Sequence, residues 1–408
     1  MDISIQKSKL LNHQNIQITG SKSESNRLLL LQALYPHIKI NNVSNSDDSE
    51  LMQKALASNE ELIDIHHAGT AMRFLTAYFS TQDGRETILT GSKRMKERPI
   101  KILVDALRAL GADISYMEND GFPPIKIKGK TLIKSQVELD AGVSSQYISA
   151  LLLIASKLEN GLVLNLKGKI TSVPYINMTL SLLNEIGIET SFVKNEITVK
   201  PQTTQGNAQS LTVESDWSSA SYFYSIIALS TVGSKITLSA YKKDSLQGDA
   251  ALADIYKNFG VDTTFENNAI TLQKANTVAV TSKINLDLSN TPDIAQTISV
   301  TAFGLGLECY MTGLHTLKIK ETDRLVALKV ELEKLGAEII ITDASLKVIA
   351  SNTINKDVSI STYNDHRMAM AFAPLALNTS ILIENADVVS KSYPQFWEDL
   401  KAIGFNLK

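Results

Sequence analysis

One short pattern recurs along the chain: an apolar residue, a glycine, a second apolar residue and then an acidic or amide residue. Its five copies are centred on glycines spaced 76, 73, 76 and 68 residues apart, at Gly111, Gly187, Gly260, Gly336 and Gly404. Because the chain has only 20 glycines in 408 residues, this spacing indicates an internal repeat. The fold must therefore contain several copies of one supersecondary unit.

The sequence around each glycine repeats as well. Apolar residues with helical periodicity precede it, as in residues 100–110 and 325–335, and alternating or β-branched residues with a polar turn follow the first four copies. This predicts helices that end at a left-handed glycine and lead into β-hairpins. A sixth, degenerate copy opens the chain, where Tyr35-Pro36 ends a helix in place of glycine. We expect three units in each of two domains, with a seam near residues 210–216.

Composition removes several classes of function. A formal charge of −3 and an aromatic content of 6% argue against a nucleic-acid-binding protein. The single cysteine, Cys309, lies in an apolar stretch, which excludes an intrachain disulfide and a cysteine-based zinc site and favours a buried residue over a nucleophile. The His66-His67 pair has no third ligand at suitable spacing, so we expect no metal.

The start of the sequence shows no basic segment followed by a long apolar run, and no stretch approaches the roughly 20 apolar residues of a membrane helix. We therefore expect a cytoplasmic protein with neither a membrane nor a nucleic-acid partner.

Arginine is used selectively. Only eight of the 40 lysines and arginines are arginine, and none lies between Arg108 and Arg324. Several stand in short segments rich in small or hydroxyl residues that begin a predicted helix, where free backbone N–H groups attract anions. Ordinary helix capping explains any one such segment. Because so many of the segments have a basic residue close to the cap, the pattern favours anion binding. The segments contain Arg27, Arg73, Arg94, Arg98, Arg324 and Arg367.

These segments resemble, in order and over essentially the whole chain, the family of EPSP synthase, or 3-phosphoshikimate 1-carboxyvinyltransferase. The most specific matches are Arg94-Met95-Lys96-Glu97-Arg98-Pro99, Lys320-Glu321-Thr322-Asp323-Arg324 and Asn364-Asp365-His366-Arg367-Met368-Ala369. Weaker ones are Gly20-Ser21-Lys22-Ser23, Ala68-Gly69-Thr70-Ala71-Met72-Arg73, Ser144-Ser145-Gln146, Gln247-Gly248-Asp249 and Lys391-Ser392-Tyr393-Pro394.

The resemblance implies an α/β fold: a two-domain inside-out α/β barrel built from six repeated βαβαββ units, three per domain. Residues 20–213 would form an N-terminal lobe that carries mainly the shikimate 3-phosphate site. Residues 1–19 with 214–408 would form a C-terminal lobe that carries the proton-transfer and phosphoenolpyruvate residues. A first strand at residues 3–5 or 16–19 would complete the C-terminal lobe.

The resemblance also implies transfer of the enolpyruvyl group of phosphoenolpyruvate to the 5-hydroxyl of shikimate 3-phosphate, with no metal or organic cofactor. Asp293 would accept the hydroxyl proton, while Glu321 and Lys22 would serve the methylene carbon and the leaving phosphate, with the division of acid and base roles left open. Phosphoenolpyruvate would contact Lys22, Gly69, Arg98, Gln146, Arg324, Arg367 and Lys391. Shikimate 3-phosphate would contact Lys22, Ser23, Arg27, Ser144, Ser145, Gln146, Ser172, Tyr175, Asp293 and Lys320.

Three positions depart from the family pattern. His67 and Thr316 stand where asparagine is frequent, and Phe74 stands where proline is common. They leave the affinity for phosphoenolpyruvate, and for the inhibitor glyphosate, open.

The alternatives are a sibling enzyme that acts on UDP-N-acetylglucosamine, a non-catalytic homologue and a nucleic-acid-binding protein. The sibling typically uses a loop cysteine, which this chain lacks, and Lys22, Asp293, Glu321 and Arg98 argue against a non-catalytic homologue. We expect a monomer.

Overall fold

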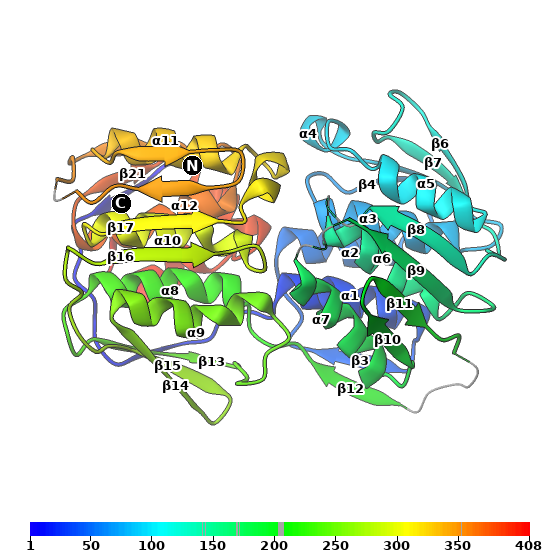
Figure 1. Ribbon diagram of the computed structural model, residues 1–408, viewed down its shortest axis with the longest axis horizontal. Helices are drawn as coiled ribbons and strands as arrows, with labels where there is room; N and C mark the ends of the chain where they lie inside the picture. Colours follow the sequence, from blue (N-terminus) through cyan, green and yellow to red (C-terminus); the bar gives the residue numbers. More distant parts are fainter. Residues whose placement is uncertain (141, 143, 169, 171, 203–207, 352) are drawn as a thin grey trace. The chain divides into compact units, whose positions relative to one another are not determined.

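The chain divides into two compact units. The computed structural model describes residues 1–140, 142, 144–168, 170, 172–202, 208–351 and 353–408. Met1–Thr19 and Glu214–Lys408 form one unit, called here the C-terminal unit, and Gly20–Val213 forms the other, the N-terminal unit (Figure 1). The chain thus passes between the units twice, and the N-terminal unit is an insertion in the sequence of the C-terminal unit.

The N-terminal unit contains three sheets in its described part. In spatial order their strands are β4 (Leu62–Asp64), β5 (Glu86–Thr90), β7 (Ile125–Lys128) and β6 (Asp113–Tyr116); β8 (Gln136–Asp140), β9 (Leu162–Lys167), β11 (Glu196–Val199) and β10 (Thr190–Val193); and β12 (Gln209–Thr212) beside β3 (Ile38–Asn41). The helices are α1 (Lys22–Leu34), α2 (Asp47–Ala57), α3 (Gly69–Ser80), α4 (Lys93–Lys96), α5 (Lys101–Leu110), α6 (Ser145–Ala155) and α7 (Val173–Glu185).

The C-terminal unit has three sheets in its described part, and each of them has four strands. Their strands are β2 (Gln14–Ile16), β13 (Lys235–Ser239), β15 (Ala269–Lys274) and β14 (Val261–Glu266); β16 (Lys283–Asp287), β17 (Glu308–Thr312), β19 (Leu346–Val348) and β18 (Ile339–Ile341); and β20 (Val358–Ile360), β21 (Ile381–Ile383), β1 (Ile3–Gln6) and β22 (Asn406–Leu407). The α-helices are α8 (Trp217–Leu229), α9 (Leu252–Ile255), α10 (Ala295–Gly304), α11 (Arg324–Lys334), α12 (His366–Phe372) and α13 (Phe396–Ala402). Short 3₁₀ helices are η1 (Gly248–Ala251), η2 (Tyr256–Phe259), η3 (Pro292–Ile294), η4 (His315–Ile319), η5 (Ala373–Leu377) and η6 (Ala386–Lys391).

Each four-stranded sheet has the same pairing. Its first two strands are parallel and the other two are antiparallel additions: Leu62 of β4 pairs with Ile88 of β5 in parallel, whereas Leu89 of β5 pairs with Ile125 of β7 antiparallel. A parallel pair needs a crossover, which α3 supplies here. This is the βαβαββ unit predicted from the sequence.

Glycine geometry explains where the helices stop. Gly111, Gly187, Gly260, Gly336 and Gly404 all have positive φ, between 75° and 110°. A residue without a side chain adopts this left-handed conformation at little cost, so it ends the helix and turns the chain into the next strand. The prediction from the repeated pattern is confirmed.

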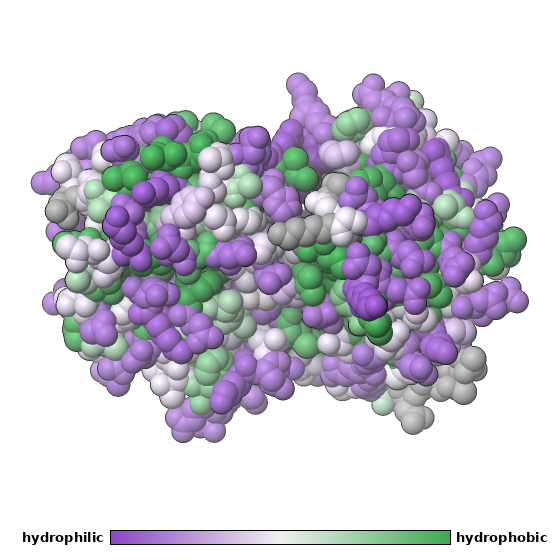
Figure 2. All heavy atoms as spheres, in the orientation of Figure 1, coloured by the Kyte–Doolittle hydropathy of each residue, from purple (hydrophilic) through white to green (hydrophobic). Residues whose placement is uncertain are grey.

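In each unit at least one helix is buried on every face, and the sheets lie outside it. In α6 every residue except Gln146 is buried, and in α10 every residue except Gly304 is buried. A helix that is apolar all round needs protein on all sides. Strands such as β8 instead alternate between exposed and buried residues, as expected of a sheet with one face to solvent. Hydrophilic side chains accordingly cover much of the face seen in Figure 2. Each unit is the inside-out α/β barrel expected from the sequence.

The N-terminal segment completes two sheets of the C-terminal unit. β1 pairs with β21 and β22, whereas β2 pairs in parallel with β13. Strands therefore form near both candidate positions, although the second one spans Gln14–Ile16 and not the predicted residues 16–19. Within it, Ser215 Oγ donates to the Ile18 carbonyl at 2.6 Å and the Asp216 amide donates to the Thr19 carbonyl at 3.2 Å, so the two chain crossings leave this unit side by side. In the described part of the chain, no helix has the length and apolar composition needed to span a bilayer.

Candidate active site

Four of the segments with an arginine begin helices, and so does the segment at Ser144, which has no arginine. α1, α6, α11 and α12 start directly after Ser21, Ser144, Asp323 and Asp365, and each of these four side chains accepts a hydrogen bond from a backbone N–H of the first turn. α3 starts at Gly69 without a side-chain cap. The local prediction is confirmed for these five helix starts, whereas Arg98 lies between α4 and α5 and Lys391 lies at the end of η6.

In the C-terminal unit the centre of the candidate site is Arg324, the first residue of α11. Its side chain is 2% exposed. Nε lies 2.6 Å from Asp365 Oδ2, Nη1 lies 2.9 Å from Asp293 Oδ1, and Nη2 lies 2.9 Å from Glu321 Oε2. Burial would lower the pKa of Arg324, but Asp365, Glu321 and Asp293 together raise it. Arg324 therefore stays charged and fixes three carboxylates from different elements.

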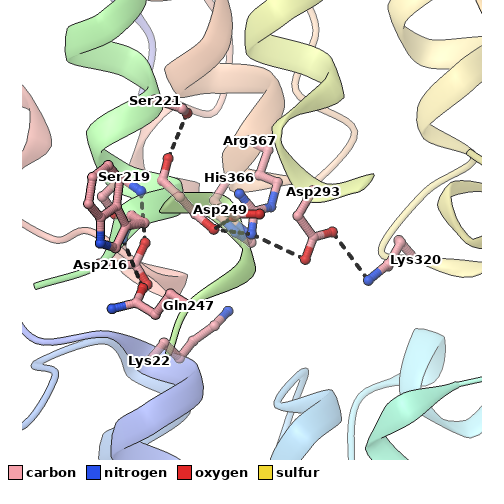
Figure 3. A network of polar contacts seen from close by, with 12 residues as sticks. Lys22, Asp216, Ser219, Ser221, Gln247, Asp249, Asp293, Lys320, His366 and Arg367 are labelled. Atoms are coloured by element: carbon pink, nitrogen blue, oxygen red, sulfur yellow. Dashed lines mark hydrogen bonds and ion pairs between the residues drawn. The ribbon is translucent and has the colours of Figure 1, made fainter. Parts of the chain in front are cut away.

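Asp293 lies where several cations converge. Lys320 Nζ is 3.2 Å from its Oδ1, and Arg367 Nη2 is 3.5 Å from its Oδ2 (Figure 3). Burial alone would raise the pKa of Asp293, but Lys320, Arg367 and Arg324 outweigh it and hold that pKa well below the usual range. In the absence of a ligand, Asp293 is thus a carboxylate whose negative charge is strongly stabilised.

Arg367 connects Asp293 to a second carboxyl group. Its Nη2 donates to Ser218 Oγ at 3.3 Å, and Ser218 in turn donates to Asp249. Asp249 is buried, and burial followed by the nearby charge of Asp293 raises its pKa to about 6. Sequence reasoning gave no role to Ser218, Asp249 or Asp365, although Asp249 and Asp365 stand in segments that resemble the family.

Lys391, predicted to bind phosphoenolpyruvate, ends η6. Its Nζ donates to the Asn364 carbonyl at 2.6 Å, next to the start of α12. Of the predicted residues of this unit, the structure joins Asp293, Lys320, Glu321, Arg324 and Arg367 in one network of contacts, to which Lys391 is adjacent through the backbone.

The N-terminal unit has its own group of predicted residues around α1. Arg27 is 2% exposed and donates to Thr179 Oγ1 at 2.8 Å, to Ser149 Oγ at 3.0 Å, and to the Ser23 carbonyl at 2.7 Å. It also donates to the Tyr175 carbonyl at 3.2 Å. Burial lowers its pKa to about 10, so it remains protonated at neutral pH.

Two of the three departures from the family pattern have visible contacts here. The Arg27 guanidinium lies 5.4 Å from the Phe74 ring centroid, within the range of a cation–π interaction. His67 Nε2 lies 3.9 Å from Asp48 Oδ1, and Lys22 Nζ lies 3.4 Å from Asp48 Oδ2. Sequence reasoning missed Asp48. Its sequence context is that of an ordinary acidic residue in the first turn of a helix, so nothing in the sequence marks it as part of a site.

Arg98 packs against the start of α3. A Cβ atom placed on Gly69 would lie 2.5 Å from Arg98 Nη1, so only glycine fits there without moving the guanidinium. Gln146, the half-buried member of the first turn of α6, donates from Nε2 to Thr70 Oγ1 at 3.1 Å. Arg98, Gly69 and Gln146 are thereby brought together.

Three predicted serines have mainly backbone roles. Ser144 caps α6, accepting a hydrogen bond from the Gln146 amide at 3.3 Å. Ser145 is buried in the first turn of α6, and Ser172 precedes α7 with a left-handed φ of 53°. Among the described residues, no group of three or more His, Cys, Asp or Glu side chains could hold a metal ion.

Comparison with known proteins identifies the family of the whole chain. The model of the family described as EPSP synthase (3-phosphoshikimate 1-carboxyvinyltransferase) matches residues 53–400. A 3-phosphoshikimate 1-carboxyvinyltransferase of Bacteroides fragilis is 46% identical over 398 residues, and one of Haemophilus influenzae is 36% identical over 425 residues. The alignments cover 96% of this chain and 96% of the Bacteroides protein, and 95% and 96% for the Haemophilus protein.

The fold is shared with a solved structure. An EPSP synthase from Acinetobacter baumannii superimposes with a TM-score of 0.81 at 20% sequence identity, covering 100% of this chain and 99% of that one. Taken with the family match over most of the sequence, these findings show that the chain belongs to the EPSP synthase family.

Proposed function

We propose that this chain transfers the enolpyruvyl group of phosphoenolpyruvate to the 5-hydroxyl of shikimate 3-phosphate and releases phosphate. The names of its relatives support this reaction. The observation that carries it is the network around Asp293, in which one carboxylate is held by Lys320, Arg324 and Arg367 beside a second carboxylate, Glu321. A reaction between two anionic metabolites that also moves two protons needs such a combination.

In the first step the 5-hydroxyl attacks the central carbon of phosphoenolpyruvate while a proton is delivered to the methylene carbon. Asp293 takes the hydroxyl proton, and Glu321 or Lys22 supplies the other. In the second step the adduct loses phosphate and a proton leaves the new methyl group, which restores the double bond. Glu321 or Lys22, whichever gave up its proton in the first step, takes up this proton, and the hydroxyl proton held by Asp293 passes to the departing phosphate or to solvent.

Ligand binding would convert Asp293 from a weak base to a stronger one. Its pKa is held low by Lys320, Arg367 and Arg324. An anion bound to Arg367 or Arg324 offsets part of that positive charge, so the pKa of Asp293 rises and proton transfer becomes easier. The base is therefore most active when phosphoenolpyruvate is present.

We assign the remaining contacts by unit. In the N-terminal unit, shikimate 3-phosphate binds Ser23, Arg27, Ser144, Ser145, Gln146, Ser172 and Tyr175, and phosphoenolpyruvate binds Lys22, Gly69, Arg98 and Gln146. In the C-terminal unit, Lys320 and Asp293 serve shikimate 3-phosphate, while Arg324, Arg367 and Lys391 serve phosphoenolpyruvate. Arg324 already contacts three carboxylates, so its share in ligand binding requires one of them to move.

The sibling reaction on UDP-N-acetylglucosamine is disfavoured by Cys309. This residue is fully buried in β17, and burial raises its thiol pKa to about 12. It can therefore act neither as a nucleophile nor as an acid at neutral pH.

A phosphate-release assay tests the proposal. The protein should release phosphate from phosphoenolpyruvate only when shikimate 3-phosphate is added, and not with UDP-N-acetylglucosamine. Asp293→Asn should lose most of this activity, whereas Asp254→Asn, which changes an exposed aspartate paired with Lys257, should keep it. Absence of phosphate release from the unmodified protein would overturn the proposed reaction. Full activity of Asp293→Asn would overturn the role of Asp293 as the base.

The proposal extends to a cytoplasmic monomer, which light scattering and cell fractionation would test. A glyphosate dose–response at fixed phosphoenolpyruvate would measure the effect of His67, Phe74 and Thr316 on inhibitor binding.

A further inference from the structure

Arg73 of α3 is a buried cation for which the structure shows no ion pair with a described carboxylate. Arg73 is 4% exposed. Nη1 donates to the Gly69 carbonyl at 3.2 Å and lies 3.6 Å from Met95 Sδ, and Nη2 donates to the Pro99 carbonyl at 3.0 Å. The guanidinium also lies 5.9 Å from the Tyr147 ring centroid. Arginine is seldom fully buried without an acidic partner, so this position calls for an explanation.

The partners of Arg73 are the residues that fix Arg98. Pro99 follows Arg98 in sequence, the Met95 carbonyl accepts the Arg98 backbone N–H at 3.1 Å, and the Arg98 guanidinium packs on Gly69. Arg73 thereby ties the first turn of α3 to both sides of the segment that carries Arg98.

The charge of Arg73 also supports a role in anion binding at Arg98. Burial, followed by the nearby positive charge of Arg98, lowers the pKa of Arg73 to about 10, which leaves it protonated at neutral pH. Two neighbouring guanidinium groups repel each other, and a buried charge without a counter-ion raises the free energy of the ligand-free state. An anion bound at Arg98 offsets both effects, so the pair favours a ligand with more than one negative charge.

We propose that Arg73 is a positioning residue for phosphoenolpyruvate: it holds Arg98 in place through Gly69, Met95 and Pro99 and adds positive potential behind it. This inference rests on the proposed function, in which Arg98 binds phosphoenolpyruvate. Arg73 does not touch the substrate, and shikimate 3-phosphate does not depend on it.

Two substitutions separate the charge from the geometry. Arg73→Met removes both, and we expect the KM for phosphoenolpyruvate to rise about tenfold or more, because a hydrogen bond from a charged group is lost together with a cation. The KM for shikimate 3-phosphate and the value of kcat should change less than about threefold. Arg73→Lys keeps the charge, but the lysine side chain cannot reach both carbonyl groups. Its KM for phosphoenolpyruvate should therefore lie between that of the unmodified protein and that of Arg73→Met.

Arg85 provides a matched control in the same unit. It also donates to a backbone carbonyl, that of Ser58 at 2.6 Å, and its guanidinium lies 4.4 Å from the Phe79 ring centroid. Arg85→Met removes a comparable set of contacts away from Arg98, and it should leave both KM values unchanged.

A binding measurement without turnover complements the kinetics. Millimolar inorganic phosphate should raise the thermal midpoint of the unmodified protein and of Arg85→Met, but raise that of Arg73→Met much less. An unchanged KM for phosphoenolpyruvate in both Arg73 variants would overturn the inference, and so would an equal rise in both KM values. If the unmodified protein releases no phosphate from the two substrates, the proposed function fails, and the phosphate protection still decides the role of Arg73. If Arg73→Met does not fold, Arg73→Lys decides it in the same assays.

Discussion

Replacement of Asp249 by asparagine should stabilise the free protein at neutral and alkaline pH but not in acid. The residue is 4% exposed, and burial together with the charge of Asp293 raises its pKa from 3.8 to about 6. Below pH 4 the carboxyl is protonated in the folded and the unfolded chain, so it carries no penalty. As pH rises towards 6, the unfolded chain loses this proton first, and the folded state becomes progressively less favourable.

The size of the effect follows from the shift. Two pKa units correspond to about 3 kcal/mol, which is the upper limit of the stability that ionisation of Asp249 removes above pH 6. Asparagine keeps a polar group beside Ser218 without the buried charge. For a unit of 150–250 residues, about 2–4 °C of thermal midpoint corresponds to each kcal/mol, so the midpoint of the C-terminal unit should rise by up to roughly 6–12 °C at pH 8.

Differential scanning calorimetry of the ligand-free protein between pH 4.5 and 8.5 measures this. The gain of Asp249→Asn should grow between pH 4.5 and about 6.5 and then level off. Asp254→Asn, in which an exposed carboxylate is changed, should give a small difference that does not follow this curve. A stabilisation of Asp249→Asn that is the same at every pH, or a loss of stability at pH 8, would refute the reasoning.

Three further changes have defined outcomes. Lys274→Met should stabilise the protein by about 1–2 kcal/mol below pH 8, because burial lowers the lysine pKa to about 8 and so makes the charged lysine unfavourable in the folded state. In urea titrations this gain in stability should disappear between pH 8 and 10.5. A gain that is the same at every pH would contradict the prediction. Arg324→Met should cost about 3–5 kcal/mol, because it leaves buried carboxylates such as Asp365 unpaired; urea denaturation with an unchanged midpoint would contradict this. Gly69→Ala should raise the KM for phosphoenolpyruvate without unfolding the protein, since its Cβ displaces the Arg98 guanidinium; unchanged steady-state kinetics would show that Arg98 moves freely.

Local chemistry explains how much of the fold could be predicted. A glycine with positive φ ends a helix whatever surrounds it, so five of the six repeat units could be located from Gly111 to Gly404. The sixth was harder, because Pro36 replaces the glycine and the only described partner of β3 is β12, from a distant part of the sequence. Strand pairing of this kind depends on the tertiary fold and leaves no local pattern.

The candidate site was predictable to the extent that its members begin helices. Ser144, Asp323 and Asp365 cap helices as expected, but a cap says nothing about which side chains meet above it. The contact of Lys22 with Asp48 and that of Ser218 with Asp249 join separate elements, so only the structure could reveal them. Phe74 was expected only as a departure from the family pattern, and its contact with Arg27 was likewise invisible in the sequence.

The insertion of Gly20–Val213 within the other unit has a consequence for synthesis on the ribosome. Residues 1–19 are translated before the inserted unit, yet their partner strands β13, β21 and β22 are translated only after the whole of it. Ile3 and Ile5, which are buried in the finished protein, must therefore remain without their sheet until β21 and β22 near the end of the sequence are made. The inserted unit can mature on the nascent chain, whereas the surrounding one closes last and exposes apolar strand edges to chaperones or aggregation in the meantime.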